Sequence, residues 1–212
     1  MDKRYAIFDM DGTITDSMPY WDGLIREYLA SQGIHKLPAG LGDSVKHLNI
    51  TQTAGVLIEK FGLTGSPAKV GMAMNAIMED HYTRDVVLKP GVVDYLDRLR
   101  EQKVHMAVAS ATALPLIRLC LDRLGLSSYF DTLQSCYELG VGKDRPDVYD
   151  ACTALWGVKR EEAAVFEDSF SGAATAKAAG YYVVGIYDEL GRDRWEAMQE
   201  LADEHILDWR QA

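Results

Sequence analysis

The sequence predicts an α/β protein whose core is a doubly wound parallel sheet and which carries an inserted, all-helical domain. The first observation is that short apolar runs alternate with stretches of helical periodicity along most of the chain, as in sheets covered by helices on both faces. The second is that residues 17–81 contain helical patterns but no convincing strand. A direct crossover between parallel strands needs only about a dozen residues, so we interpret this stretch as an inserted domain.

The expected core elements follow one another in a regular order. Tyr5–Phe8 is a short apolar run that ends in acidic residues and Gly12, which favours a buried strand over a helix. Right-handed crossovers would join it to the later strands in one parallel sheet. The later strands are expected at Val104–Ala109, Thr132–Gln134, Ala163–Phe166 and Tyr182–Ile186. The helices are expected at Val92–Gln102, Leu114–Leu124, Arg145–Leu155 and Ala173–Ala179.

Residues 17–86 are expected to form the helical insertion, and residues 1–16 and 87–212 the core. Turn-forming residues mark both borders, Asp16-Ser17-Met18-Pro19 on the way out and Lys89-Pro90-Gly91 on the way back. The chain is therefore expected to contain one large domain interrupted by a smaller one. Helical periodicity within the insertion covers Trp21–Ser31, Ser44–Phe61 and Pro67–Tyr82.

Composition limits the possible partners. The 22 basic and 32 acidic residues give a formal net charge of -10, which disfavours nucleic acid or an anionic membrane surface and favours a small substrate. Cys120, Cys136 and Cys152 are widely spaced and form no CxxC pair, so we expect buried thiols in a reducing compartment. The apolar run before Asp9 is too short for a signal peptide or a membrane span. We expect a soluble cytoplasmic protein that is a monomer or weak dimer.

Polar residues follow three of the predicted strands. Asp9 comes after the first strand, Ser110 after the second and Glu167-Asp168 after the fourth. Because the carboxyl ends of parallel strands share one edge of the sheet, where ligands bind, these side chains should converge. Each of them alone is also an ordinary strand-end or helix-capping residue. Three together, with the Gly142-Lys143 pair in another connection, indicate a functional site.

The residue types indicate chemistry on a phosphate group. A carboxylate on a rigid strand end, such as Asp9, can attack phosphorus and form an aspartyl-phosphate. Asp11 could protonate the leaving oxygen and later activate water. Asp9 and Asp168 offer the hard oxygen donors that suit Mg²⁺, and the metal would let an anionic nucleophile approach an anionic substrate.

Other groups at this edge could hold the phosphate. Ser110 lies just before a predicted helix, so its hydroxyl and neighbouring backbone N–H groups can bind phosphoryl oxygens, and Lys143 can neutralise their charge. Gly12 permits a tight turn, and Gly172 is expected to free the backbone near the metal loop. The alternatives are an N-cap serine, a solvated lysine and ordinary turn glycines. The expected substrate contacts in the core are Gly12, Thr13 and Ala111.

The same residues resemble the four motifs of the haloacid dehalogenase-like superfamily. The first motif corresponds to Asp9-Met-Asp11-Gly-Thr13 and the second to Ser110. The third corresponds to Lys143 in Gly-Lys-Asp-Arg-Pro-Asp, and the fourth to Glu167-Asp168 in Phe-Glu-Asp-Ser-Phe-Ser-Gly. The motifs stand in the family's order and run across the whole predicted core.

This resemblance implies a Rossmann-like core, an aspartyl-phosphate intermediate and a Mg²⁺ ion. It implies that Asp9 is the nucleophile, and that Asp11 is the acid/base and gives its main-chain carbonyl to the metal. Ser110 and Lys143 resemble phosphoryl-binding residues. In the pair Glu167-Asp168, the aspartate resembles a metal ligand and the glutamate a residue that supports the metal or its water.

The insertion resembles the helical caps of phosphoglycolate phosphatases and β-phosphoglucomutases. Such caps close over small phosphorylated metabolites and exclude bulk water, so the cap would largely determine the choice of substrate. Alternatively, the aromatic candidates belong to the cap core and the polar ones face solvent. The expected contacts are Tyr20, Trp21 and Lys46, with Ser44, His47 and Asn49 as further candidates.

The predicted function is Mg²⁺-dependent hydrolysis of a small phosphomonoester such as a sugar phosphate. Phosphomutase activity of the β-phosphoglucomutase type is an alternative, but Trp21 occupies the hinge position where those mutases carry a histidine. A non-catalytic phosphate-binding or sensing protein is a further alternative, although it would gain little from a positioned general acid such as Asp11. Asp11 and Asp168 argue against halide chemistry.

Lys143 is followed by Asp144 where the family often has proline, which leaves the loop conformation open.

Overall fold

The computed structural model describes residues 2–45 and 50–212, and the chain divides into two compact units. One unit contains the residues up to Ser17 together with Val86–Ala212, and the other is Met18–Asp85. No helix in the described part of the chain is long and apolar enough to cross a membrane.

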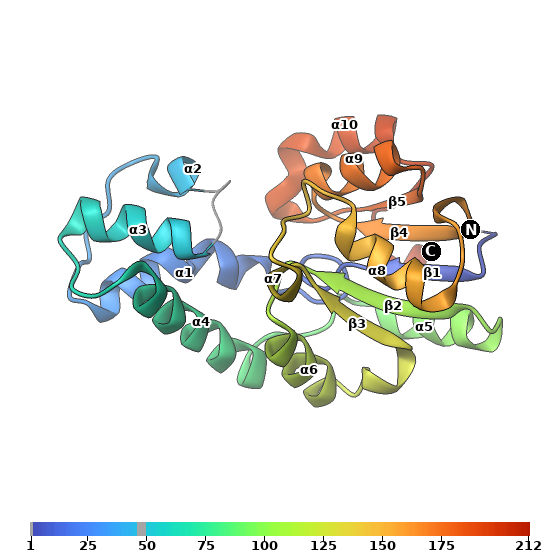
Figure 1. Ribbon diagram of the computed structural model, residues 1–212, viewed down its shortest axis with the longest axis horizontal. Coiled ribbons are helices and arrows are strands. Elements are labelled where there is room, and N and C mark those ends of the chain that lie inside the picture. The colour runs from blue at the N-terminus through green and yellow to red at the C-terminus, as the bar shows by residue number, and fades with distance from the viewer. Residues whose placement is uncertain (1, 46–49) are drawn as a thin grey trace. The chain divides into compact units, whose positions relative to one another are not determined.

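Among the described residues, six parallel strands form one sheet in the order β3-β2-β1-β4-β5-β6 (Figure 1). The predicted α/β, doubly wound class is confirmed. The sequence does not predict β6, because this strand has three residues and lies at the sheet edge, without a continuous apolar run. The strands are β1 (Tyr5–Phe8), β2 (His105–Ser110), β3 (Thr132–Ser135), β4 (Ala163–Glu167), β5 (Tyr182–Ile186) and β6 (Glu204–Ile206).

Helices connect the strands of this unit. α8 begins later than the predicted Arg145, because Pro146 precedes its first residue and proline, which lacks an N–H, is tolerated only at a helix start. α9 begins earlier than the predicted Ala173, because Ser169 caps it by accepting a hydrogen bond from the N–H of Gly172. The short α7 and α10 leave no separate periodicity in the sequence. The helices are α5 (Val92–Glu101), α6 (Leu114–Arg123), α7 (Cys136–Leu139), α8 (Asp147–Trp156), α9 (Phe170–Ala179) and α10 (Trp195–Leu201).

β1 lies where the order of the strands changes direction. β2 and β3 follow on one side of it, and β4, β5 and β6 lie on the other. Phe8 pairs with Val108 of β2 and with Phe166 of β4, so the residues just beyond these positions emerge side by side. In doubly wound sheets, ligands bind at the carboxyl edge of such a switch point.

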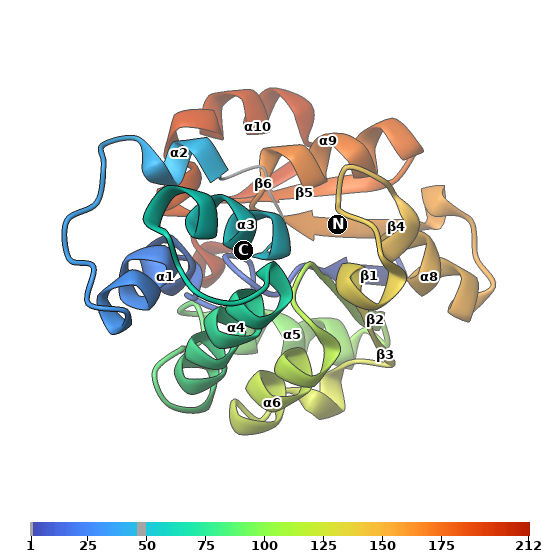
Figure 2. The ribbon, with the colours of Figure 1, turned by 60° about the vertical axis from the view of Figure 1, so that its left-hand side comes forward.

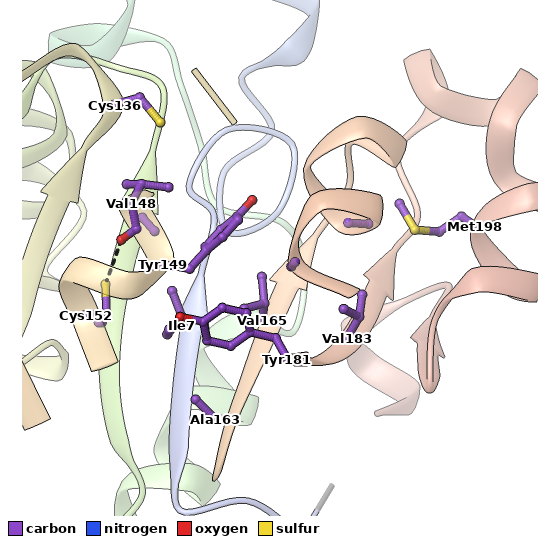
Figure 3. Packing of buried hydrophobic residues seen from close by; sticks show 14 residues of the cluster. Ile7, Cys136, Val148, Tyr149, Cys152, Ala163, Val165, Tyr181, Val183 and Met198 are labelled. Atoms are coloured by element: carbon purple, nitrogen blue, oxygen red, sulfur yellow. Dashed lines mark hydrogen bonds between the residues drawn. The ribbon is translucent and has the colours of Figure 1, made fainter. Parts of the chain in front are cut away.

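Buried side chains cover one face of the sheet with an apolar cluster. Ile7, Val165 and Val183 come from neighbouring strands, and Tyr149 of α8 and Met198 of α10 join them from the helices (Figure 3). The three strand residues point the same way because side chains alternate between faces along a strand. α8, α9 and α10 therefore belong to the layer on this face.

Aromatic rings dominate the opposite face. Phe8 and Phe166 stack with their ring centroids 4.3 Å apart. The ring of Trp209 lies 6.1 Å from that of Phe166 and 4.9 Å from that of Tyr95 on α5. The middle of the sheet is thus packed against the 3₁₀ turn Trp209–Gln211, which comes late in the sequence.

The unit Met18–Asp85 is helical. α3 and α4 lie side by side, and α1 packs against α4 (Figure 2). Ser66 caps α4 by accepting a hydrogen bond from the N–H of Lys69 at 3.3 Å. Of the helix predicted over 44–61, the structure describes α3 from Ile50 onward and the end of α2; residues 46–49 lie outside the described residues. The helices are α1 (Met18–Ser31), α2 (Leu41–Val45), α3 (Ile50–Phe61) and α4 (Pro67–Arg84).

His81 joins α1 to α4 within this unit. Its Nε2 lies 2.8 Å from Oε2 of Glu27 on α1, and its Nδ1 lies 2.8 Å from Oδ2 of Asp85, just after α4. The ring of Tyr20 lies 4.5 Å from the imidazole. Burial lowers the pKa of His81, but the hydrogen bonds with Glu27 and Asp85 outweigh this effect and raise it above its usual value.

Protonation of His81 is expected to stabilise the helical unit. Because its pKa is higher in the folded chain, the stabilisation is fully present below the unfolded pKa of about 6.5 and is lost as the pH rises through the folded value. We expect urea unfolding to show a larger stability difference between wild type and His81→Gln at about pH 6 than at about pH 9. An equal difference at both pH values would contradict this assignment.

Gly91 precedes α5 and allows two segments of the core to approach closely. Its φ of 90° lies in the left-handed region, and a Cβ added there would lie 2.6 Å from the backbone nitrogen of Arg210. Gly125 also has a left-handed φ, of 74°, but no described atom lies within 4 Å of its Cβ position.

This pair of glycines separates backbone strain from steric overlap. Gly91→Ala is expected to lower the free energy of unfolding by about 3 kcal/mol or more, because both costs apply, and Gly125→Ala by only about 1 kcal/mol. Denaturant unfolding of the two variants measures the difference. Equal losses would show that the contact with Arg210 does not limit the size of residue 91.

Candidate active site

Three carboxylates gather at the carboxyl edge of the sheet. Asp9 follows β1, Glu167 ends β4 and Asp168 comes next, and one carboxylate oxygen of each lies within 4.8 Å of the others. Asp9 is 5% exposed and Glu167 is fully buried. Burial raises the pKa of Asp9 well above its usual range, with Lys143 opposing and the other two carboxylates adding to the rise. Burial, then the charge of Glu167, raises the pKa of Asp168 to about 7.

Lys143 supplies positive charge to this cluster. It lies between α7 and α8, and its Nζ donates hydrogen bonds to Oδ1 of Asp9, at 2.5 Å, and to Oε1 of Glu167. Burial alone would lower the pKa of Lys143, but the two carboxylates outweigh it and raise the pKa above its usual value. The lysine therefore stays protonated and bridges the residues at the ends of β1 and β4.

Further contacts fix Glu167. Tyr149 of α8 donates its hydroxyl to Oε1 at 2.8 Å, and the backbone N–H of Ser169 donates to Oε2 at 3.3 Å. A Cβ on Gly172 would lie 2.8 Å from the carboxyl carbon of Glu167. Gly172 is thus needed for space and not, as the sequence suggested, for backbone freedom. Tyr149 is absent from the sequence prediction because a tyrosine on a buried helix face has the pattern of a core residue.

The side chain of Asp11 points to hydroxyl groups and not into the carboxylate cluster. Ser17 donates to Oδ1 at 2.7 Å, while Thr112, at 2.8 Å, and Ser110, at 3.4 Å, donate to Oδ2. Ser110 in turn accepts a hydrogen bond from the backbone N–H of Thr112 at 3.0 Å. The sequence does not single out Ser17 and Thr112, because hydroxyl residues are common in turns and helix caps.

The turn after Asp9 is held by its own backbone. The carbonyl of Met10 accepts hydrogen bonds from the N–H groups of Ile14 and Thr15 at 3.0 and 2.9 Å, and Gly12 adopts a φ of 79°, which favours glycine. Thr13 is fully buried, and its hydroxyl donates to Oδ1 of Asp168 at 3.1 Å. The hydroxyl of Thr13, a predicted substrate contact, is thus engaged with the carboxylate cluster.

The remaining predicted substrate contacts stay predictions. Ala111 is exposed beside Ser110. In the helical unit, the hydroxyl of Tyr20 donates to the carbonyl of Asp85 at 3.4 Å, and the indole N–H of Trp21 donates to the hydroxyl of Tyr82 at 3.0 Å. Lys46, His47 and Asn49, and the side chain of Ser44, lie outside the described residues.

The donor set of the cluster fits a hard divalent cation. Asp9, Glu167 and Asp168 offer only carboxylate oxygens, the ligands that such ions prefer. A cation would also offset the repulsion among three carboxylates in a buried site. The side chain of Asp11 lies outside this group, so its expected contribution to a metal site is its main-chain carbonyl.

Comparison with known proteins identifies the family. Residues 3–180 match the family model of haloacid dehalogenase-like hydrolases. The chain belongs to this family. Hexitol phosphatase B of Escherichia coli strain K12 is 31% identical over 185 residues, which cover 82% of this chain and 79% of that protein. Phosphoglycolate phosphatase 1 of Pseudomonas aeruginosa is 29% identical over 183 residues, covering 84% of this chain and 66% of that protein.

A solved structure shows the same fold. A Thermotoga maritima protein assigned as a β-phosphoglucomutase superposes with a TM-score of 0.77 at 25% identity, covering 98% of this chain and 95% of that one. The resemblance to haloacid dehalogenase-like proteins, inferred from four short motifs, is confirmed. Hydrolases of this family generally use a divalent metal, in agreement with the buried acidic cluster.

Replacing Gly172 by alanine is expected to displace the carboxylate of Glu167. We expect Gly172→Ala to lower the free energy of unfolding by about 2 kcal/mol, because the added methyl group overlaps a buried side chain. Gly55→Ala in α3 is the matched control, since its Cβ would make only an ordinary contact of 3.9 Å with Pro67. It should raise the stability by about 0.5 to 1 kcal/mol. Urea unfolding that shows both variants stabilised would contradict this geometry.

Proposed function

We propose that this enzyme hydrolyses small phosphomonoesters, such as sugar phosphates, through an aspartyl-phosphate on Asp9. The observation that carries the proposal is that two aspartates in one turn have different surroundings. Asp9 lies against Lys143 in a buried carboxylate cluster, whereas Asp11 lies among hydroxyl groups. Family membership and the phosphatase names of the relatives make the chain a phosphoric monoester hydrolase.

In the first step, a carboxylate oxygen of Asp9 attacks phosphorus. A bond forms between these atoms, and the bond between phosphorus and the ester oxygen breaks. Asp11 in its protonated form gives its proton to the leaving oxygen, so a neutral alcohol departs. Lys143 and the hydroxyl of Ser110 hold the phosphoryl oxygens during this transfer.

In the second step, water attacks the phosphorus of the aspartyl-phosphate. Asp11, now ionised, accepts a proton from this water. The bond between phosphorus and Asp9 breaks, inorganic phosphate leaves, and the carboxylate of Asp9 is restored. The hydroxyls of Ser17 and Thr112 donate to Asp11, whose side chain lies outside the carboxylate cluster. In the proposed cycle this one carboxyl group acts first as acid and then as base.

Mg²⁺ is the proposed cofactor. The carboxylates of Asp9 and Asp168 and the main-chain carbonyl of Asp11 are the proposed ligands, and Glu167 supports the ion or its water. When bound, the ion neutralises charge between the anionic nucleophile and the anionic phosphate. The oxygen-only donor set and the hydrogen bond from Thr13 to Asp168 support this assignment.

A small phosphorylated metabolite is the proposed partner, with Tyr20, Trp21 and Lys46 among the residues that select it. Phosphomutase activity is the second candidate, favoured by the similarity to the Thermotoga maritima structure. A mutase would require, at the hinge position of Trp21, a group that accepts the proton of the substrate hydroxyl to which the phosphoryl group is transferred. An indole N–H is only a donor, and here it is bonded to Tyr82, so hydrolysis is favoured.

A phosphate-release assay tests this proposal. The purified protein should release inorganic phosphate from members of a panel of hexose, hexitol and triose phosphates with phosphoglycolate, and a chelator should abolish the release. Asp9→Asn should lower kcat at least about 1,000-fold, and Asp11→Asn about 100- to 10,000-fold, because they remove the nucleophile and the acid/base.

Asp131→Asn is the matched control for these variants. Asp131 lies just before β3, at the opposite edge of the sheet, where it bonds to His105 and Trp156. This variant should keep kcat within about two-fold of wild type. Absence of turnover on the whole panel, or an Asp9→Asn variant as active as wild type, would contradict the proposal. Isomerisation of a substrate without phosphate release would identify a mutase.

A further inference from the structure

A tryptophan late in the chain contacts the turn that carries the proposed nucleophile. The indole N–H of Trp209 donates to the backbone carbonyl of Thr13 at 3.0 Å, across a sequence separation of 196 residues. Both residues are buried, so this carbonyl depends on a partner within the protein. The family model matches residues 3–180 and therefore identifies nothing in the segment that contains Trp209.

Several contacts hold Trp209 in place. Asp208 caps its 3₁₀ turn by accepting a hydrogen bond from the N–H of Arg210 at 2.9 Å. Gly91 leaves room for the backbone of Arg210, and the rings of Tyr95 and Phe166 pack against the indole. The donor thus belongs to a segment that is packed against the face of the sheet opposite Tyr149.

Thr13 connects this donor to the carboxylate cluster. Its carbonyl accepts from Trp209, and its hydroxyl donates to Oδ1 of Asp168. The peptide group that carries this carbonyl is held from two sides, because its N–H, that of Ile14, donates to the carbonyl of Met10 at 3.0 Å and its oxygen accepts from Trp209. Loss of the Trp209 hydrogen bond would therefore alter the position of both the Asp9–Asp11 turn and the carboxylate of Asp168.

We propose that Trp209 is a positioning residue for the phosphatase reaction. Its N–H fixes the carbonyl of Thr13, and Thr13 in turn fixes the carboxylate of Asp168 and the turn between Asp9 and Asp11. This inference rests on the proposed function, because it assigns Trp209 to the site where that reaction takes place. Small displacements of reacting groups have large effects on rate. Loss of this one hydrogen bond should therefore change kcat by a measurable amount.

Two substitutions separate the hydrogen bond from the packing. Trp209→Phe keeps an aromatic ring and loses the donor, whereas Trp209→His can keep a ring N–H near the position of the indole nitrogen and loses apolar area. We expect Trp209→Phe to lower kcat about ten-fold with KM changed less than about two-fold. Trp209→His should keep kcat within about three-fold of wild type while losing more stability than Trp209→Phe.

Trp156→Phe is the matched control. The indole N–H of Trp156 donates to Oδ2 of Asp131 at 3.0 Å, at the other edge of the sheet, and its loss should leave kcat within about two-fold. A purely structural role for Trp209 predicts the opposite order, with kcat following stability and Trp209→His the less active variant. That order, or a Trp209→Phe variant as active as wild type, would overturn the proposal.

A measurement on wild-type protein covers the case in which the variants fail to fold. The indole N–H signals of Trp209 and Trp156 are followed by ¹⁵N NMR while Mg²⁺ alone is added. The signal of Trp209 should shift, because Thr13 links it to Asp168, and that of Trp156 should not. If phosphatase activity is present and the Trp209 signal does not move, the positioning role is wrong. If neither activity nor any Mg²⁺-dependent shift is found, the proposed function fails and this inference falls with it.

Discussion

The interaction on which the site depends is the ion pair of Lys143 with two buried carboxylates, those of Asp9 and Glu167. Together with Asp168 they bring three acidic groups and one cation into a small volume, where water cannot screen the charges. Burial disfavours the ionised carboxylates, as the raised pKa values of Asp9 and Asp168 show. The surrounding structure offsets this cost with hydrogen bonds, including those from Tyr149, Thr13 and the backbone of Ser169 to the cluster.

The surroundings of the two aspartates of the first turn also support the different tasks proposed for them. Asp9 and Asp11 are separated by a single residue, yet one faces an ammonium group and the other faces hydroxyl groups. Lys143 favours the charged form of Asp9 that a nucleophile needs, against the effect of burial, whereas hydroxyl groups orient the carboxylate of Asp11. Pairs of acids held in contrasting surroundings are a common way to divide nucleophilic and proton-transfer roles.

The parts of this site that the sequence predicts are those with a local signal. An apolar run followed by an acidic residue marks Asp9 and the pair Glu167-Asp168, because in this fold ligands bind at the carboxyl ends of the strands. Tyr149, Ser17 and Trp209 carry no such signal, since their residue types are ordinary in cores and turns and their partners lie elsewhere in the chain. The strand β6 is missed for a related reason: its pairing with β5, and not its own pattern, defines it.

The contacts that position the site also explain why its stability and its chemistry are linked. A carboxyl whose folded pKa lies above its unfolded value costs folding free energy once the pH is high enough to ionise it in the unfolded chain. Asp9 and Asp168 are in this position at neutral pH in the metal-free protein. A cation bound by the folded chain would return part of that free energy. The aromatic layer that includes Phe8, Phe166 and Trp209 packs the sheet beneath this cluster, and the indole N–H of Trp209 connects the layer to the turn after Asp9.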